Sequence, residues 1–125
     1  MSDKKIVLAI DDNVQQLSEF KSILTPKYDL RVVKGASEAI VYLNRNKSDI
    51  ILLDIAMPNI DGSEFLEDIK KIPSYMDTPI IIVSGTIDQD FAQKAKSYGA
   101  FDVLQKPVNQ ADLIKAIEKA LAAVD

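Results

Sequence analysis

Residues 49–62 read "DIILLDIAMPNIDG" and combine a short apolar run with an acidic residue and a polar loop. The four apolar residues, Ile50–Leu53, form the kind of continuous hydrophobic run that is typical of a strand buried on both faces of a parallel sheet. The run ends at Asp54, and the segment "PNIDG" at 58–62 has the composition of a loop. The sequence therefore predicts a carboxylate at the carboxyl end of a buried strand.

Similar patterns predict four further strands. The runs Ile6–Ile10 and Ile80–Val83 are also continuous and rich in β-branched residues, which indicates central strands. The segments 28–32 and 101–105 alternate apolar with polar residues, which favours strands with one side less covered. Apolar residues at helical spacing occupy the intervening segments 14–24, 36–43, 65–72 and 91–98, and the final segment 113–124.

This regular alternation predicts an α/β fold. Parallel strands joined by right-handed helical crossovers form a doubly wound sheet with helices on both faces, a three-layer α/β/α arrangement. With the two alternating strands at the edges, the expected strand order is 2-1-3-4-5, which is the flavodoxin-like (βα)5 topology. For the helix starts, Ser37 and Ser63 are the expected N-caps, and Asn109 with Asp112 approximates a capping box.

Length and composition narrow the function classes. The chain of 125 residues predicts one domain over 1–125, with no output domain. It has no cysteine and no histidine, which excludes thiolate chemistry, disulfides and the commonest zinc sites. The net charge of −4 argues against a direct nucleic-acid partner, and the apolar runs are too short to span a membrane, so we expect a cytoplasmic protein.

Polar residues follow four of the predicted strands. They are Asp11 and Asp12, Asp54, Ser84 and Lys106. The carboxyl ends of parallel strands lie at one edge of the sheet, and ligands bind at the switch point between the first and third strands. Three clustered carboxylates repel one another unless a cation lies among them, and oxygen ligands favour Mg²⁺. The set predicts a magnesium site that also binds a phosphoryl group undergoing transfer.

Each of these residues alone has an ordinary structural explanation. Asp11 and Asp12 could cap the first helix, Asp54 could be a loop carboxylate, and Lys106 could be solvated. Five polar residues at the same end of four strands make these explanations improbable as a set.

The chain resembles the receiver domains of two-component response regulators, in particular the stand-alone chemotaxis type. The pieces that carry the resemblance, in family order and spacing, are "AIDDN" (9–13), "LLDIAMPNIDG" (52–62), "PIIIVSG" (79–85), "GA" (99–100) and "KPVNQADL" (106–113). They extend over essentially the whole chain. The resemblance implies a Mg²⁺-dependent signalling domain that catalyses only its own phosphorylation and dephosphorylation.

The resemblance also implies roles for the site residues. Asp54 would accept the phosphoryl group from a sensor histidine kinase or a phosphotransfer protein. Asp12 would bind the metal directly, Asp11 mainly through water, and Ala56 through its backbone carbonyl, with Asp54 as a further ligand.

The remaining roles concern the phosphoryl group and the loops. Ser84 would follow the phosphoryl group with its hydroxyl, and Lys106 would form a salt bridge to it. The resemblance further implies a cis peptide bond between Lys106 and Pro107, and a loop after Asp54 that is shaped by Pro58 and Gly62.

One position departs from the family pattern. Three residues before the site lysine many receivers have Tyr or Phe, whose ring moves inward on activation, whereas this chain has Val103. Phe101 has the same strand parity but is not an equivalent. We expect residues 85–87 and the helix at 91–98 to carry the conformational change.

The downstream partner is expected to be a protein. It would bind the face formed by the helix at 91–98, the strand at 101–105 and the final helix, with candidate contacts Gln93, Lys94, Ser97, Tyr98 and Gln105.

Alternatives remain at this point. The chain could be an isolated receiver of a longer regulator or hybrid kinase. It could be a Mg²⁺-dependent aspartyl-phosphate hydrolase, although such enzymes carry a second acid where Ala56 stands. Nucleotide or flavin binding would require a phosphate loop after the first strand, where "DDNVQQ" would repel phosphate unless a cation intervened.

Overall fold

The computed structural model describes residues 4–57, 60–85 and 87–124. Its five strands form one parallel sheet in the order β2-β1-β3-β4-β5, as predicted. The strands are β1 (Ile6–Ile10), β2 (Asp29–Val33), β3 (Ile50–Leu53), β4 (Ile80–Ser84) and β5 (Asp102–Gln105).

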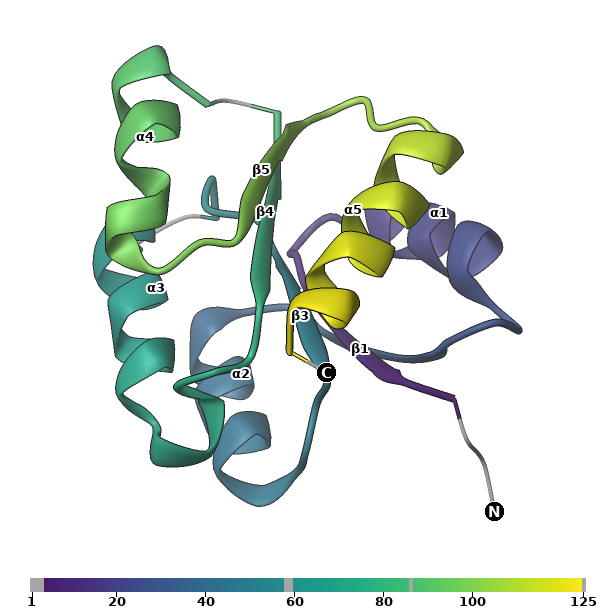
Figure 1. Ribbon diagram of the computed structural model, residues 1–125, viewed down its shortest axis with the longest axis horizontal. Helices are drawn as coiled ribbons and strands as arrows, with labels where there is room; N and C mark the ends of the chain where they lie inside the picture. Colours follow the sequence, from purple (N-terminus) through teal and green to yellow (C-terminus); the bar gives the residue numbers. More distant parts are fainter. Residues whose placement is uncertain (1–3, 58–59, 86, 125) are drawn as a thin grey trace.

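Helices cover both faces of the sheet, which confirms the three-layer prediction (Figure 1). They are α1 (Val14–Leu24), α2 (Ala36–Arg45), α3 (Gly62–Lys71), α4 (Gln89–Lys94) and α5 (Gln110–Val124), with the 3₁₀ turns η1 (Pro73–Tyr75) and η2 (Ala95–Tyr98). α1 and α5 lie on one face, whereas α2, α3 and α4 lie on the other. No helix in the described ranges is long and apolar enough to cross a membrane.

The hydrophobic core has two halves, one on each face of the sheet. In β3, for example, Ile51 and Leu53 pack with α2 and α3, whereas Ile50 and Leu52 pack with α1 and α5. All four residues of β3 are buried, and so are all five of β4. Burial on both faces explains why these strands are continuous apolar runs in the sequence.

The helix predicted at 91–98 is divided in two. The α-helix ends at Lys94, and the chain continues as the 3₁₀ turn η2 up to Gly99, whose φ of 114° lies in the left-handed region. Ala95 is the only buried residue in α4 and η2, so few buried contacts stabilise regular α-helical geometry here. The terminal turn is therefore tightened, which is common at helix ends.

Two of the predicted N-caps are wrong. Asp61 caps α3, because its Oδ1 accepts hydrogen bonds from the backbone N–H groups of Ser63 and Glu64. The hydroxyl of Ser63 also donates to Asp61 Oδ1. Ser37 lies inside α2, which begins directly after Gly35. At α5, in contrast, Asn109 Oδ1 accepts from the Asp112 N–H at 2.8 Å, and the Asn109 amide donates to the Asp112 carboxylate, as predicted.

The register of the sheet brings the site residues together. Ile10 lies opposite Leu53 in the β1–β3 pair, so the residues that follow them, Asp11 and Asp54, are neighbours. The Asp54 N–H donates to the Ile10 carbonyl at 2.9 Å. Ser84 is the last residue of β4, and its carbonyl accepts from the Lys106 N–H at 2.9 Å. Four strand ends therefore converge on one point.

Candidate functional site

Two buried carboxylates form the centre of the site. Asp11 is 1% exposed and Asp54 is 6% exposed, although they follow the ends of two different strands. Charged groups at this depth are rare unless they are paired. The other side chains of the site supply the partners that such burial requires.

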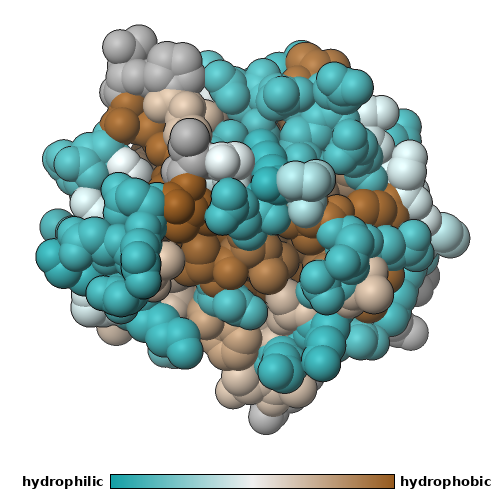
Figure 2. All heavy atoms as spheres, turned by 90° about the horizontal axis from the view of Figure 1, so that it is seen from above, coloured by the Kyte–Doolittle hydropathy of each residue, from teal (hydrophilic) through white to brown (hydrophobic). Residues whose placement is uncertain are grey.

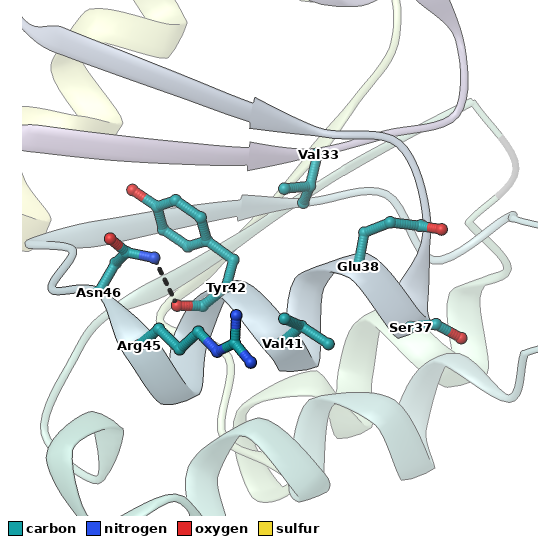
Figure 3. A pocket seen from close by; sticks show the side chains of 7 residues that line it. All are labelled: Val33, Ser37, Glu38, Val41, Tyr42, Arg45 and Asn46. Carbon is teal, nitrogen blue, oxygen red and sulfur yellow. Dashed lines mark hydrogen bonds between the residues drawn. The ribbon is translucent and has the colours of Figure 1, made fainter.

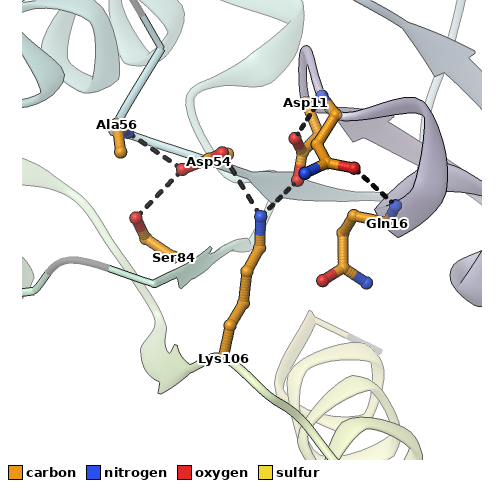
Figure 4. Close-up of polar contacts among 7 residues, drawn as sticks. Asp11, Gln16, Asp54, Ala56, Ser84 and Lys106 are labelled. Carbon is orange, nitrogen blue, oxygen red and sulfur yellow. Dashed lines mark hydrogen bonds and ion pairs between the residues drawn. The ribbon is translucent and has the colours of Figure 1, made fainter.

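Lys106 lies between the two carboxylates (Figure 4). Its Nζ is 2.8 Å from Asp11 Oδ2 and 3.3 Å from Asp54 Oδ2. The peptide bond from Lys106 to Pro107 is cis, which confirms the prediction for this step. One ammonium group thus partly neutralises two acids that come from distant parts of the chain.

The second oxygen of Asp54 is held by neutral donors. Oδ1 accepts the Ser84 hydroxyl at 2.9 Å and the Ala56 backbone N–H at 2.9 Å (Figure 4). Ser84 is fully buried, so its hydroxyl is confined to this contact. Asp54 is therefore oriented from both sides, by a cation at one oxygen and by two neutral donors at the other.

Burial and ion pairing shift the pKa values of Asp11 and Lys106. Burial is the largest influence on Asp11 and raises its pKa, whereas the hydrogen bonds from Lys106 and Asn13 act in the opposite direction. For Lys106, burial disfavours the charged ammonium, but the hydrogen bond to Asp11 and the charge of Asp54 outweigh it, so the pKa is raised. The two carboxylates thus stabilise the charged form of Lys106, whereas burial destabilises the charged form of Asp11.

A third acid completes an oxygen cluster. Asp12 is exposed, and one carboxylate oxygen each from Asp11, Asp12 and Asp54 lie within 4.8 Å of one another. The cluster offers oxygen ligands only, which are the donors that Mg²⁺ prefers. The residues present thus fit a hard divalent cation. Figure 2 views the molecule from the side on which the strands end, where hydrophilic residues lie next to hydrophobic ones.

All five polar residues predicted from the strand ends lie at this site. Backbone donors from the loop after β3 were expected near the carboxylate, and the Ala56 N–H bonds to Asp54 at 2.9 Å. The pattern did not identify that donor by residue, and it did not indicate the N–H of Asn13, which bonds to Asp11 at 2.9 Å. In both cases the donor lies two residues after the acid, the spacing of an Asx turn, and that spacing could have revealed them. The proposed metal contact of Ala56 is its carbonyl, and it stays a prediction.

The loop after Asp54 is partly described. Gly62 lies against Ile55, where an added Cβ would be 2.7 Å from the Ile55 Cβ, so a side chain here would require the loop to shift. Pro58, to which we assigned a role in shaping the loop, lies outside the described residues, as does Thr86 of the expected switch segment.

Comparison with known proteins identifies the relatives of this chain. Residues 7–118 match the model of the response regulator receiver domain family. The chain is 37% identical over 106 residues to protein-glutamate methylesterase/protein-glutamine glutaminase 2 of Oleidesulfovibrio alaskensis, covering 81% of this chain and 29% of the relative. It is 31% identical over 126 residues to the 3',5'-cyclic-nucleotide phosphodiesterase regA of Dictyostelium discoideum, covering 98% of this chain and 16% of the relative. The chain thus spans less than a third of the length of either relative.

Solved structures agree in fold over nearly the whole chain. A CheY-like receiver domain protein of Methanospirillum hungatei superposes with a TM-score of 0.89 at 27% identity, covering 97% of this chain and 96% of that one. The chemotaxis protein CheY4 of Vibrio cholerae superposes with a TM-score of 0.87 at 27% identity, covering 94% and 99%.

Proposed function

Because this chain belongs to the response regulator receiver domain family, we propose that Asp54 accepts a phosphoryl group and that this modification switches a protein-binding surface. The observation that carries the proposal is the placement of Asp54 between two kinds of donor. Lys106 lies at one carboxylate oxygen, and Ser84 and the Ala56 N–H lie at the other.

The proposed reaction is a transfer from a phosphohistidine of a sensor kinase or a phosphotransfer protein. A carboxylate oxygen of Asp54 attacks phosphorus, the P–N bond breaks, and the imidazole leaves and takes up a proton. The product is an acyl phosphate on Asp54. Lys106 stabilises the negative charge that moves with the phosphoryl group, and Ser84 donates a hydrogen bond to one of its oxygens.

Asp11, Asp12 and Asp54, with the carbonyl of Ala56, are the groups that we propose to bind Mg²⁺. When bound, this ion neutralises phosphoryl oxygens and lowers the repulsion between them and the carboxylates. The three acids bring three negative charges to the site, and Lys106 alone balances one of them, so a divalent ion would complete the neutralisation.

The experiment is incubation with acetyl phosphate, a small donor that needs no kinase. We expect the wild-type protein to gain one phosphate that is stable to acid and labile to base, and EDTA to prevent its formation. Intact-mass spectrometry measures the gain and peptide mapping locates it. No labelling in the presence of Mg²⁺, or a phosphate on serine or threonine, would reject the proposal.

The comparisons favour this function over hydrolysis of an outside substrate. The family is a signalling domain, whereas the matched esterase and phosphodiesterase are longer proteins of which this chain covers less than a third. We propose that the chain acts on no substrate besides its own acyl phosphate. Sustained release of inorganic phosphate from nitrophenyl phosphate, lost on chelation, would instead support the hydrolase alternative.

We propose that the switched surface lies on α4, β5 and α5, and that the segment after β4 carries the change. Val103 is half-buried and occupies the position where many receivers have an aromatic residue. The aromatic pair of this region is instead Phe91 with Tyr98, whose ring centroids are 5.8 Å apart. Phe91 belongs to α4, in which no residue is fully buried, and its half-buried side chain packs at the margin of the core. Fewer buried contacts therefore hold α4 in one position than hold α3, which has three buried residues.

We therefore expect beryllofluoride with Mg²⁺ to shift the backbone amide resonances of residues 84–98. Beryllofluoride is a phosphoryl analogue, and binding at Asp54 would draw the Ser84 hydroxyl and with it the following segment. Two-dimensional NMR of the labelled protein measures the shifts, and Asp54→Asn with the same additions is the control. Unperturbed amides over residues 84–98 would contradict a switch through α4.

A further inference from the structure

The open edge of the sheet, at β2, has the features of a second protein-binding surface. This surface is distinct from the carboxylate site. In the described part of the chain β2 pairs with β1 alone. The Asp29 N–H donates to the Lys5 carbonyl, and the Val33 carbonyl accepts from the Asp11 N–H, so these residues direct their backbone groups toward β1. Backbone groups alternate in direction along a strand, so those of Leu30 and Val32 point outward.

This edge is flanked by a groove on each face of the sheet. On the α2 side a groove of about 500 Å³ is lined by residues that include Val33, Val41 and Tyr42 (Figure 3). On the α1 side a groove of about 400 Å³ is lined by residues that include Leu30 and Val32. The two grooves lie on either side of the same strand, because successive side chains of β2 point to opposite faces.

Exposed apolar residues gather around this edge. Among the described residues five large hydrophobic side chains are exposed, and three of them, Val14, Val32 and Val41, line these grooves. Val32, the last residue but one of the edge strand, is 46% exposed. An edge strand with unpaired backbone groups and exposed apolar side chains is a template for pairing with another strand.

We propose that this edge binds an extended segment of a partner protein, which adds a sixth strand beside β2. Alternate side chains of the segment would enter the two grooves. On the α2 side the lining is mostly apolar and its two charged residues, Glu38 and Arg45, have opposite signs, so the entering residue is apolar. On the α1 side the only charged residues of the lining are Lys21 and Lys34, so the segment carries an acidic residue on that face.

Charge also decides against a second copy of this chain as the occupant. Each copy would bring Lys21 and Lys34 to the same interface, with no acid in the α1-side groove to balance the lysines. Arg31 is already engaged, because its Nε and Nη2 bond to the two carboxylate oxygens of Asp29 at 2.9 Å each. This ion pair places two polar side chains on the edge strand, so indiscriminate pairing with apolar strands is disfavoured.

The test selects short random peptides displayed on phage against the unphosphorylated protein and then measures the affinity of the enriched peptides for two variants. Val32→Pro removes an outward N–H from the edge, a position where a strand tolerates proline. Val32→Thr keeps this N–H and the β-branched shape. We expect enriched peptides with alternating apolar residues and an acidic residue, and binding that Val32→Pro weakens at least about tenfold while Val32→Thr stays within about threefold.

Three results would overturn the proposal. The first is that no peptides are enriched. The second is an equal loss of affinity in both variants, which would indicate a side-chain groove without strand pairing. The third is concentration-dependent self-association that Val32→Pro abolishes, which would indicate a second copy as the occupant. A far-UV circular dichroism spectrum and a cooperative urea transition like those of wild type show that Val32→Pro is folded. Since Asp54→Asn should bind the peptides like wild type, failure here and failure of the phosphorylation proposal are distinguishable.

A measurement on the wild-type protein covers the case in which Val32→Pro does not fold. Bound peptide should slow amide hydrogen exchange at Leu30 and Val32, whose N–H groups would enter the new ladder, while the exchange of Arg31, already directed toward β1, stays the same. Unchanged exchange at Leu30 and Val32 under saturating peptide would reject strand addition.

Discussion

Asp54→Asn is expected to abolish stable phosphorylation by acetyl phosphate while the fold is preserved. An amide oxygen is a poor nucleophile, and an acyl phosphate cannot form on the neutral side chain in the way it forms on a carboxylate. The substitution is nearly isosteric, and the Ser84 and Ala56 donors that hold Oδ1 still find an oxygen there. The loss should therefore reflect chemistry, with no disturbance of the packing.

The matched control is Asp68→Asn, an exposed acid on α3 that removes the same charge away from the site. It should be labelled at the wild-type rate. Intact-mass spectrometry after incubation with Mg²⁺ and acetyl phosphate gives the labelled fraction for both variants. Base-labile label on Asp54→Asn at the wild-type level would place the acceptor elsewhere and contradict the assignment of the site.

Lys106→Met is expected to lower the free energy of unfolding of the metal-free protein by about 3 kcal/mol at neutral pH. Methionine retains much of the aliphatic volume but leaves the buried carboxylates of Asp11 and Asp54 without their shared cation. Mg²⁺ should restore a large part of the loss, because a divalent ion among the acids replaces the missing charge. Urea unfolding with and without Mg²⁺ measures both effects, with the exposed Lys115→Met on α5 as control.

The pH dependence of this loss follows from Asp11. Its pKa is raised above the ordinary 3.8, so protons bind it more tightly in the folded state, and its contribution to stability is present below pH 3.8 and lost as the pH rises through the folded pKa. Without Lys106 the pKa should rise further, so Lys106→Met loses more stability than wild type over this range. The two proteins should differ little in acid and most at neutral pH. A constant difference across pH would show that Lys106 stabilises by packing alone.

Much of this molecule could be predicted from local pattern. Runs such as Ile50–Leu53 are buried on both faces, so their composition alone indicates central parallel strands. The strand order then fixes where in the sheet each apolar run ends. Asp54 and Lys106 could therefore be placed at one site, because each lies just after such a strand. Helix boundaries were less accurate, because Ser63 and Asp61 both suit a cap and the backbone conformation decides between them.

Hydrophobic periodicity was enough to predict the topology and the residues of the carboxylate site, because a parallel arrangement leaves few positions for the residues at strand ends. The packed molecule, in contrast, is needed to see that Asp54 Oδ2 contacts Lys106, that Oδ1 contacts Ser84, and that α4 ends at Lys94. It alone also placed the two grooves beside β2. The physical reason is that pair distances and surface shape depend on how helices pack against the sheet, and that packing joins residues with no fixed separation along the chain.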